Sequence, residues 1–123
     1  MTETTPSTPP PRGPLTTHIL DVSLGRPASG VAVRLHRLEG DVFLDLGGGV
    51  TDADGRLAGL LPPGGLKLGT YRLTFGVGDY FAASHRSSFY PYVDVVFVVE
   101  STDQHHHVPL LLSPFGYSTY RGS

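Results

Sequence analysis

The sequence of 123 residues contains no cysteine, so it excludes a disulfide framework and any chemistry that needs a thiolate. No apolar run approaches the roughly 20 residues that a membrane-spanning helix requires. The N-terminal stretch also lacks the apolar core of a secretory signal. The formal net charge of −2 provides no basic surface of the kind that attracts nucleic acid or an anionic membrane. We therefore expect a cytoplasmic protein with neither nucleic acid nor membrane among its partners.

Two common catalytic motifs are missing as well. The run Gly47-Gly48-Gly49 lacks the Lys-Ser/Thr that would follow it in a phosphate-binding loop, and we read it as an ordinary loop. The sequence contains no Gly-x-Ser-x-Gly nucleophile elbow. Nucleotide-dependent phosphoryl transfer and α/β-hydrolase chemistry are thus not indicated.

The composition present is that of a globular domain, with 39% hydrophobic and 16% charged residues. Residues 1–14 contain five prolines and a single apolar residue, Met1, and cannot bury enough surface to offset their ordering entropy. We interpret residues 1–14 as a flexible tail rich in proline and threonine, and residues 15–123 as one folded domain.

Within this domain, short alternating or β-branched segments are separated by glycine- and proline-rich turns at nearly regular intervals. This pattern predicts an all-β sandwich of about eight strands. The one expected helix, residues 79–85, would begin at Asp79 as its N-cap. The expected strands cover residues 15–22, 31–38, 42–46, 56–61, 71–77, 92–100, 104–112 and 117–121.

Histidine is the most conspicuous functional residue type, because three of the six histidines are consecutive. In a strand, His105 and His107 point to one face and His106 to the other. Two imidazoles on one face could bind a transition metal or act as an acid–base pair near neutral pH, but a solvated patch explains them equally well. His18, on a face with Thr16, and Arg56, after an Asp-Gly turn, are likewise unremarkable when considered singly.

Three blocks of sequence change this assessment because together they resemble the 5-hydroxyisourate hydrolases, which are transthyretin-like enzymes. The most specific block is the run of seventeen residues from His107 to Ser123, HVPLLLSPFGYSTYRGS, since chains of that family close on Tyr-Arg-Gly-Ser. The other two are Leu15–Asp21 with Gly25–Ala28 shortly after, and Thr51–Arg56. His106 departs from the family, which usually has an aromatic residue between two histidines.

The resemblance implies a transthyretin-like sandwich of two four-stranded antiparallel sheets with one short helix. It also implies hydrolysis of 5-hydroxyisourate to 2-oxo-4-hydroxy-4-carboxy-5-ureidoimidazoline, a step of urate degradation toward allantoin. The active sites would lie in a channel between the subunits of a homotetramer, with no metal or other cofactor.

The family's catalytic residues correspond here to His18, Arg56, His107 and Ser123, with His18, Arg56 and Tyr120 binding substrate. In such a reaction neutral imidazole would take a proton from water, and the guanidinium of Arg56 would hold the developing oxyanion. The carboxylate of Ser123 could pair with Arg56 or with Arg121.

Two alternatives remain open at this point. A non-catalytic carrier of the transthyretin type would share the fold, and fold alone does not imply function. The polar residues His18, Arg56 and His107 argue against a carrier. A metal-binding module built on the three consecutive histidines is the other alternative, although no Asp, Glu or Cys stands close enough in sequence to complete a ligand set.

Overall fold

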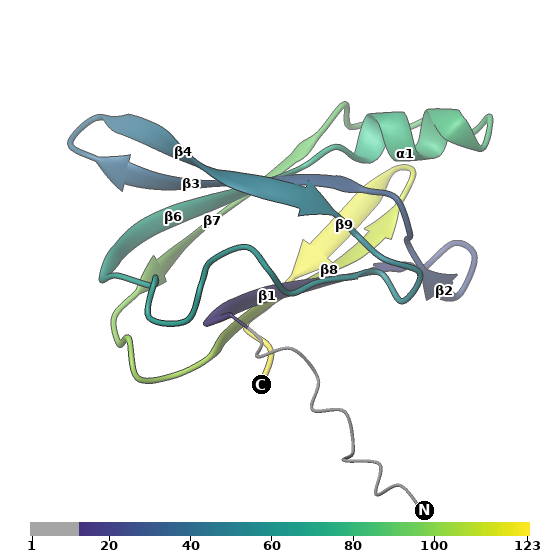
Figure 1. The fold of residues 1–123 in the computed structure, drawn as a ribbon. Coiled ribbons are helices and arrows are strands. Elements are labelled where there is room, and N and C mark those ends of the chain that lie inside the picture. Colours follow the sequence, from purple (N-terminus) through teal and green to yellow (C-terminus); the bar gives the residue numbers. More distant parts are fainter. Residues whose placement is uncertain (1–12) are drawn as a thin grey trace, which may run out of the picture.

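A computed structural model describes residues 13–123 and shows two β-sheets packed face to face, with one short helix at one end (Figure 1). The elements in chain order are β1 (Leu15–Asp21), β2 (Arg26–Pro27), β3 (Ala32–Glu39), β4 (Val42–Val50), β5 (Arg56–Leu57), β6 (Gly69–Phe75), α1 (Val77–Ala83), β7 (Val93–Val99), β8 (His106–Ser113) and β9 (Gly116–Thr119). The predicted all-β sandwich with one helix is confirmed.

The two sheets differ in their number of strands. One has the order β4-β3-β6-β7, and the other has the order β2-β1-β8-β9 with β5 also paired to β1. The second sheet thus has five strands, because the two-residue strand β2 forms inside a segment that was expected to be a turn. It is also not wholly antiparallel, since β1 and β8 run parallel over seven residue pairs. This parallel pair brings the first strand beside the histidine run.

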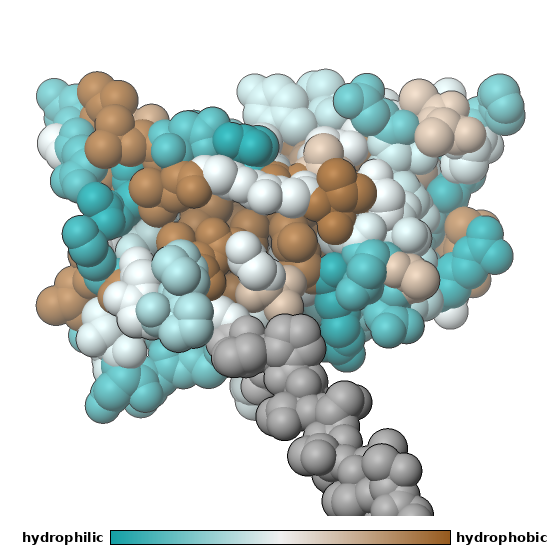
Figure 2. Space-filling view, in the orientation of Figure 1, coloured by the Kyte–Doolittle hydropathy of each residue, from teal (hydrophilic) through white to brown (hydrophobic). Residues whose placement is uncertain are grey.

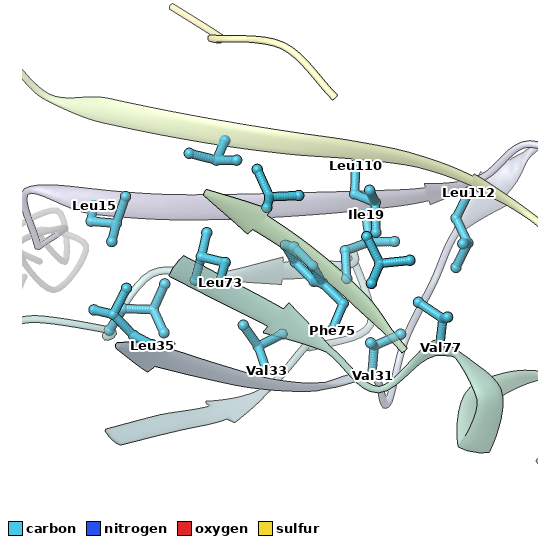
Figure 3. Close-up of a cluster of buried hydrophobic side chains, with 14 of the residues drawn as sticks. Leu15, Ile19, Val31, Val33, Leu35, Leu73, Phe75, Val77, Leu110 and Leu112 are labelled. Atoms are coloured by element: carbon cyan, nitrogen blue, oxygen red, sulfur yellow. The ribbon is translucent and has the colours of Figure 1, made fainter. Parts of the chain in front are cut away.

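The core lies between the sheets, where alternate residues of each strand point inward. In β3, Val33 and Leu35 are fully buried while Arg34 between them is exposed. Figure 3 shows the inward side chains of both sheets meeting across this layer, with Ile19 and Leu110 on one side and Leu73 and Phe75 on the other.

The prediction of a loop at Gly47–Gly49 is wrong, because these residues continue strand β4 to Val50. They pair with the first half of β3, and a register irregularity follows between Leu35 and His36. Gly48 is needed for close packing against β3, whereas Gly47 has a positive φ of 116°. A Cβ on Gly48 would stand 2.0 Å from the Val33 carbonyl oxygen, so only glycine fits there.

The helix occurs where it was expected but begins two residues earlier. Its N-cap is Gly76, which offers no side-chain cap, and Asp79 lies in the first turn instead. A carboxylate in that turn still interacts favourably with the helix dipole. The start is set by packing, since Val77 and Phe81, one turn apart, are both fully buried.

Gly13 and Pro14, which the sequence analysis assigned to the tail, belong to the folded part. The Gly13 N–H donates to the Ala58 carbonyl at 3.3 Å, and the His106 N–H donates to the Pro14 carbonyl at 2.9 Å. The rest of the predicted tail, residues 1–12, lies outside the described residues.

Within residues 13–123, no helix has both the length and the apolar character to cross a membrane. Figure 2 shows apolar side chains reaching the surface in the middle of the face seen in Figure 1, between β4 and the β5–β6 connection.

Candidate active site

The outer face of the five-stranded sheet carries the polar residues that the sequence analysis selected. In β1 the side chains of Thr17 and Ile19 point into the sandwich, where they are buried. Alternation therefore sends Thr16 and His18 to the opposite face. The expectation that His18 shares a face with Thr16 is confirmed.

Arg56 joins this face through a tight turn. The Asp52 carboxylate accepts hydrogen bonds from the backbone N–H of Asp54 and of Arg56, at 2.9 and 3.0 Å. This turn sets Arg56 directly opposite His18 in the β1–β5 pair. Cross-strand partners project to the same side of a sheet, so the exposed guanidinium and the half-buried imidazole are neighbours.

His107 reaches the same face from strand β8, where it is the parallel partner of Thr16. The Thr16 hydroxyl lies 2.8 Å from Nδ1 of His107 and 2.8 Å from Nε2 of His105. These two contacts confirm that His105 and His107 share a face.

His106 points the other way and is 5% exposed, with its Nδ1 lying 3.0 Å from the Gln104 carbonyl oxygen. The histidine run is therefore not the solvated patch that the sequence left open.

The C-terminal segment folds back over His107. An isolated β-bridge joins His107 to Gly122, whose N–H donates to the His107 carbonyl at 2.8 Å. A Cβ on Gly122 would lie 2.5 Å from Cδ2 of the imidazole, so the bare backbone of this glycine packs on the ring. The segment thus confines His107 on the side away from Thr16.

A cavity of about 240 Å³ adjoins this segment, and its lining includes His106, His107, Val108 and Tyr120. Its opposite wall is strand β7, from Val95 to Val98. Tyr120 itself is 57% exposed, just beyond the end of β9. His18 and Arg56 do not line this cavity but lie across the sheet from it.

The electrostatics of the face favour a neutral His107. Burial lowers the pKa of His107 below its ordinary value of 6.5, and electrostatic interactions with Arg56, His105 and His18 lower it further. The same interactions show that these four side chains form one electrostatic cluster. A neutral imidazole at pH 7 is available as a base.

The structure brings His18, Arg56 and His107 together on three adjacent strands, and places Tyr120 beside His107. The expected pairing of Ser123 is not found. The three ion pairs within residues 13–123 involve Arg34, Arg37 and Arg86. Arg121 instead donates to Oε1 of Gln104 at 2.9 Å.

Sequence reasoning missed two members of this cluster, Thr16 and His105. Alternation had already put Thr16 on the face of His18, and His105 on the face of His107. The missing information was the parallel β1–β8 pairing, which is a contact between residues some 90 positions apart. No group of three or more His, Cys, Asp or Glu side chains among the described residues is placed to hold a metal ion.

A model of the HIUase/Transthyretin family matches residues 15–122. The 5-hydroxyisourate hydrolase of Caulobacter vibrioides is 54% identical over 113 residues, covering 89% of this chain and 97% of its own. That of Mus musculus is 50% identical over 112 residues, covering 89% and 95%.

Among solved structures, Klebsiella pneumoniae 5-hydroxyisourate hydrolase superposes with a TM-score of 0.79 at 44% identity, covering 89% of this chain and 97% of its own. Sea bream transthyretin in complex with thyroxine superposes with a TM-score of 0.84 at 32% identity, covering 89% and 94%. Fold and site thus define a transthyretin-like sandwich with a polar outer face. The chain belongs to the HIUase/Transthyretin family.

Proposed function

We propose that this protein is an enzyme that hydrolyses 5-hydroxyisourate to 2-oxo-4-hydroxy-4-carboxy-5-ureidoimidazoline, a step of urate degradation toward allantoin. The observation that carries the proposal is the placement of Arg56, His18 and His107 on one face of three neighbouring strands. The solved transthyretin shares the fold as closely as the solved hydrolase does. It is therefore this polar group, rather than the fold, that supports catalysis.

The reaction needs a base for the attacking water and a cation for the oxyanion that forms at the ring carbonyl. His107 is the better placed base, since its surroundings keep it neutral, and His18 acts beside it. Arg56 keeps its charge throughout and presents a planar fork of donors to the imide-like oxygens and to the oxyanion. The pair of histidines and the arginine supply both requirements without a cofactor.

Tyr120 is assigned to substrate binding, and Ser123 to the catalytic group. Tyr120 shares the cavity with His107, and Gly122 ties the last residues to the same histidine. The Tyr120 ring is 57% exposed and can stack on a flat heterocycle bound beside His107. Ser123 follows the bridge directly and adds polar groups within reach of the bound ring.

The active form in this proposal is a homotetramer with the sites in a channel between subunits. The outer face of the five-stranded sheet is open to solvent in the single chain, although it carries the polar cluster. Packing that face against another subunit would exclude water from the site and strengthen its electrostatic interactions. The absence of cysteine fits a cytoplasmic location.

The direct test is to add freshly made 5-hydroxyisourate and follow its ultraviolet band with and without the protein. We expect accelerated decay that is unaffected by a chelator and is lost in Arg56→Gln. His85→Asn, at an exposed residue with φ of 59° after the helix, is the matched control and should retain full activity. Decay equal to the protein-free rate would overturn the proposal, and thyroxine binding without hydrolysis would identify a carrier.

A further inference from the structure

A single hydroxyl group joins two imidazoles on the outer face of the site. Thr16 Oγ1 lies 2.8 Å from Nδ1 of His107 and 2.8 Å from Nε2 of His105. Thr16 is only 5% exposed, so water competes little for these hydrogen bonds. The three groups therefore form a short chain that ends on the proposed base.

A threonine hydroxyl has one proton to donate, so it can donate to one of the two rings and must accept from the other. In one arrangement, Nδ1–H of His107 donates to Thr16 and Thr16 donates to Nε2 of His105. In the reverse arrangement, His105 donates to Thr16 and Thr16 donates to Nδ1 of His107. The two arrangements place the proton of neutral His107 on different ring nitrogens.

We propose that Thr16 and His105 are positioning residues that keep the proton of neutral His107 on Nδ1, which leaves Nε2 as the acceptor for the proton of the attacking water. The inference rests on the proposed function of His107 as base. It concerns how Thr16 sets the tautomer of that residue, with Nε2 of His105 accepting from the Thr16 hydroxyl.

Only this arrangement lets Nε2 of His107 accept a proton directly. When Nε2 of His107 takes the proton from water, the imidazolium has a proton on both nitrogens. The Nδ1–H to Thr16 bond then persists unchanged, so nothing has to reorganise at the moment of reaction. In the reverse arrangement Nε2 already carries the proton of the neutral ring, so that nitrogen could not accept another until the hydroxyl and both rings had rearranged.

The ring is also held on its other side. Gly122 packs against Cδ2 of His107, the carbon next to Nε2, and its N–H bonds to the His107 backbone. Thr16 and Gly122 together fix the ring plane, since one contact is at Nδ1 and the other at the opposite edge. Nδ1 is then engaged with Thr16, and Nε2 is the ring nitrogen left to accept the proton of water.

The first test compares Thr16→Val with Thr16→Ser. Valine keeps the shape and the β-propensity but lacks the hydroxyl, whereas serine retains it. We expect Thr16→Val to lower kcat about 10- to 100-fold with KM within about twofold, the scale seen when a partner that orients a functional histidine is lost. Thr16→Ser should recover most of kcat. Full kcat in a folded Thr16→Val protein would overturn the proposal, as would equal losses in both variants.

The second test reads the tautomer directly, without any turnover. Long-range ¹H–¹⁵N NMR spectra of ¹⁵N-histidine-labelled protein should show the Nδ1–H form for His107 in the parent chain and a loss of that preference in Thr16→Val. His105→Phe removes the acceptor of the Thr16 hydroxyl, so Thr16 can donate to His107; His107 should then shift to the Nε2–H form and kcat should fall by a similar factor. An Nε2–H form in the parent, or an unchanged tautomer in His105→Phe, would refute the arrangement. The spectra do not depend on substrate. If the chain fails to hydrolyse 5-hydroxyisourate, the proposed function is wrong, but the NMR spectra still test the tautomer of His107.

Discussion

His107 lies where a positive charge is unfavourable, and this determines the pH range in which it can act as a base. Burial and the nearby Arg56, His105 and His18 all lower its pKa below the ordinary 6.5. A histidine with a lowered pKa stays neutral to lower pH than a free one, so the base is present throughout the neutral range. It is lost only as the pH falls through the lowered pKa.

The charge of Arg56 is one cause of this shift, and its removal gives a first prediction. In Arg56→Gln the pKa of His107 should rise toward 6.5, because one positive neighbour is gone. Arg56→Lys keeps the charge and should leave the pKa nearly unchanged. An NMR titration of the His107 ring protons measures both variants. A pKa that falls or stays constant in Arg56→Gln would contradict the proposed proximity of these side chains.

The alternation of the histidine run gives a second prediction, in which neighbouring residues have different effects. His107→Gln should lower the hydrolysis rate by at least about two orders of magnitude, the usual scale for losing an acid–base group. His106→Gln should have little effect on the rate but should lower Tm, because His106 is buried in the sandwich and bonded to Gln104. Initial rates and thermal melts distinguish the two. Greater catalytic sensitivity at His106 would mean that the strand register is wrong.

At the scale of single residues, the sequence alone predicted most of the outer face. Period-two alternation separates His106 from its two neighbours and groups His18 with Thr16, and both follow from strand geometry. The hydrogen bonds of Thr16 could not be predicted in this way. They depend on which strand lies beside β1, and alternation within one strand carries no information on its neighbour.

Among the elements, the C-terminal segment after β9 has the most direct effect on the site, and it gives a third prediction. Gly122→Val should lower activity strongly, because any Cβ at this position would lie 2.5 Å from the His107 ring and displace it. Deleting Tyr120–Ser123 should also remove most hydrolysis while the sandwich stays folded, since no buried core residue is lost. Circular dichroism checks folding and the ultraviolet assay checks activity. A folded, fully active deletion would rule out substrate contacts in this segment.

The junction of β1 with the helix gives a fourth prediction, on stability. Asp21 is fully buried and accepts hydrogen bonds from Ser23, Tyr80 and Arg86, the last at 2.9 Å. Burial raises the pKa of Asp21, but the bonds from Ser23, Arg86 and Tyr80 outweigh it, so the pKa lies below the ordinary 3.8. The carboxylate is therefore charged in the folded protein at neutral pH.

Arg86→Met should lower the free energy of unfolding by about 1–3 kcal/mol at pH 7, the cost of leaving a buried acceptor without its partner. Arg34→Met is the matched control. Its ion pair with Asp45 is half exposed, so the loss there should stay below about 1 kcal/mol. The contribution of Asp21 is present above pH 3.8 and is lost as the pH falls through its lowered pKa. In urea melts, the difference in free energy of unfolding between Arg86→Met and the parent should therefore become smaller as the pH falls. Equal losses in Arg86→Met and Arg34→Met at pH 7 would contradict this account.

At the scale of elements, the sequence predicted which strands exist more accurately than where they begin and end. Strands with inward alternation, such as β3 and β6, were located to within two residues. Strand β4 was predicted too short because its glycines also fit a loop. Gly48 is required by the close approach of β3, which is a tertiary contact. The parallel β1–β8 pair was not anticipated, since the order of strands in a sheet depends on non-local packing.

At the scale of the whole molecule, each sheet has an edge strand that pairs on one side only within the described residues. These strands are β7 in one sheet and β9 in the other. Both edges border the cavity that holds His107 and Tyr120, through Val95–Val98 on one side and Thr119 on the other. Large apolar side chains are exposed nearby, including Val96, Val98 and Tyr117. Open edges with apolar side chains favour pairing with another chain, and natural proteins cover such edges.

The last prediction is that hydrolysis depends on assembly, because the outer face of a single chain leaves Arg56 exposed and the cavity open to water. Water weakens the interaction of the guanidinium with a developing oxyanion, so a monomer should be a poor catalyst even when it is folded.

Phe115, 71% exposed at the β8–β9 turn, lies outside the proposed catalytic residues and is a suitable position at which to disturb association. Phe115→Asp should shift the mass measured by sedimentation from that of the proposed tetramer toward that of one chain, and activity should fall in proportion to the tetramer that remains. Phe115→Tyr, which keeps the ring, should behave like the parent. Progressive dilution of the parent should likewise lower the specific activity as the proposed tetramers dissociate. Monomers of Phe115→Asp that retain full specific activity would show that each chain carries a complete site, and the channel between subunits would then have no part in the chemistry.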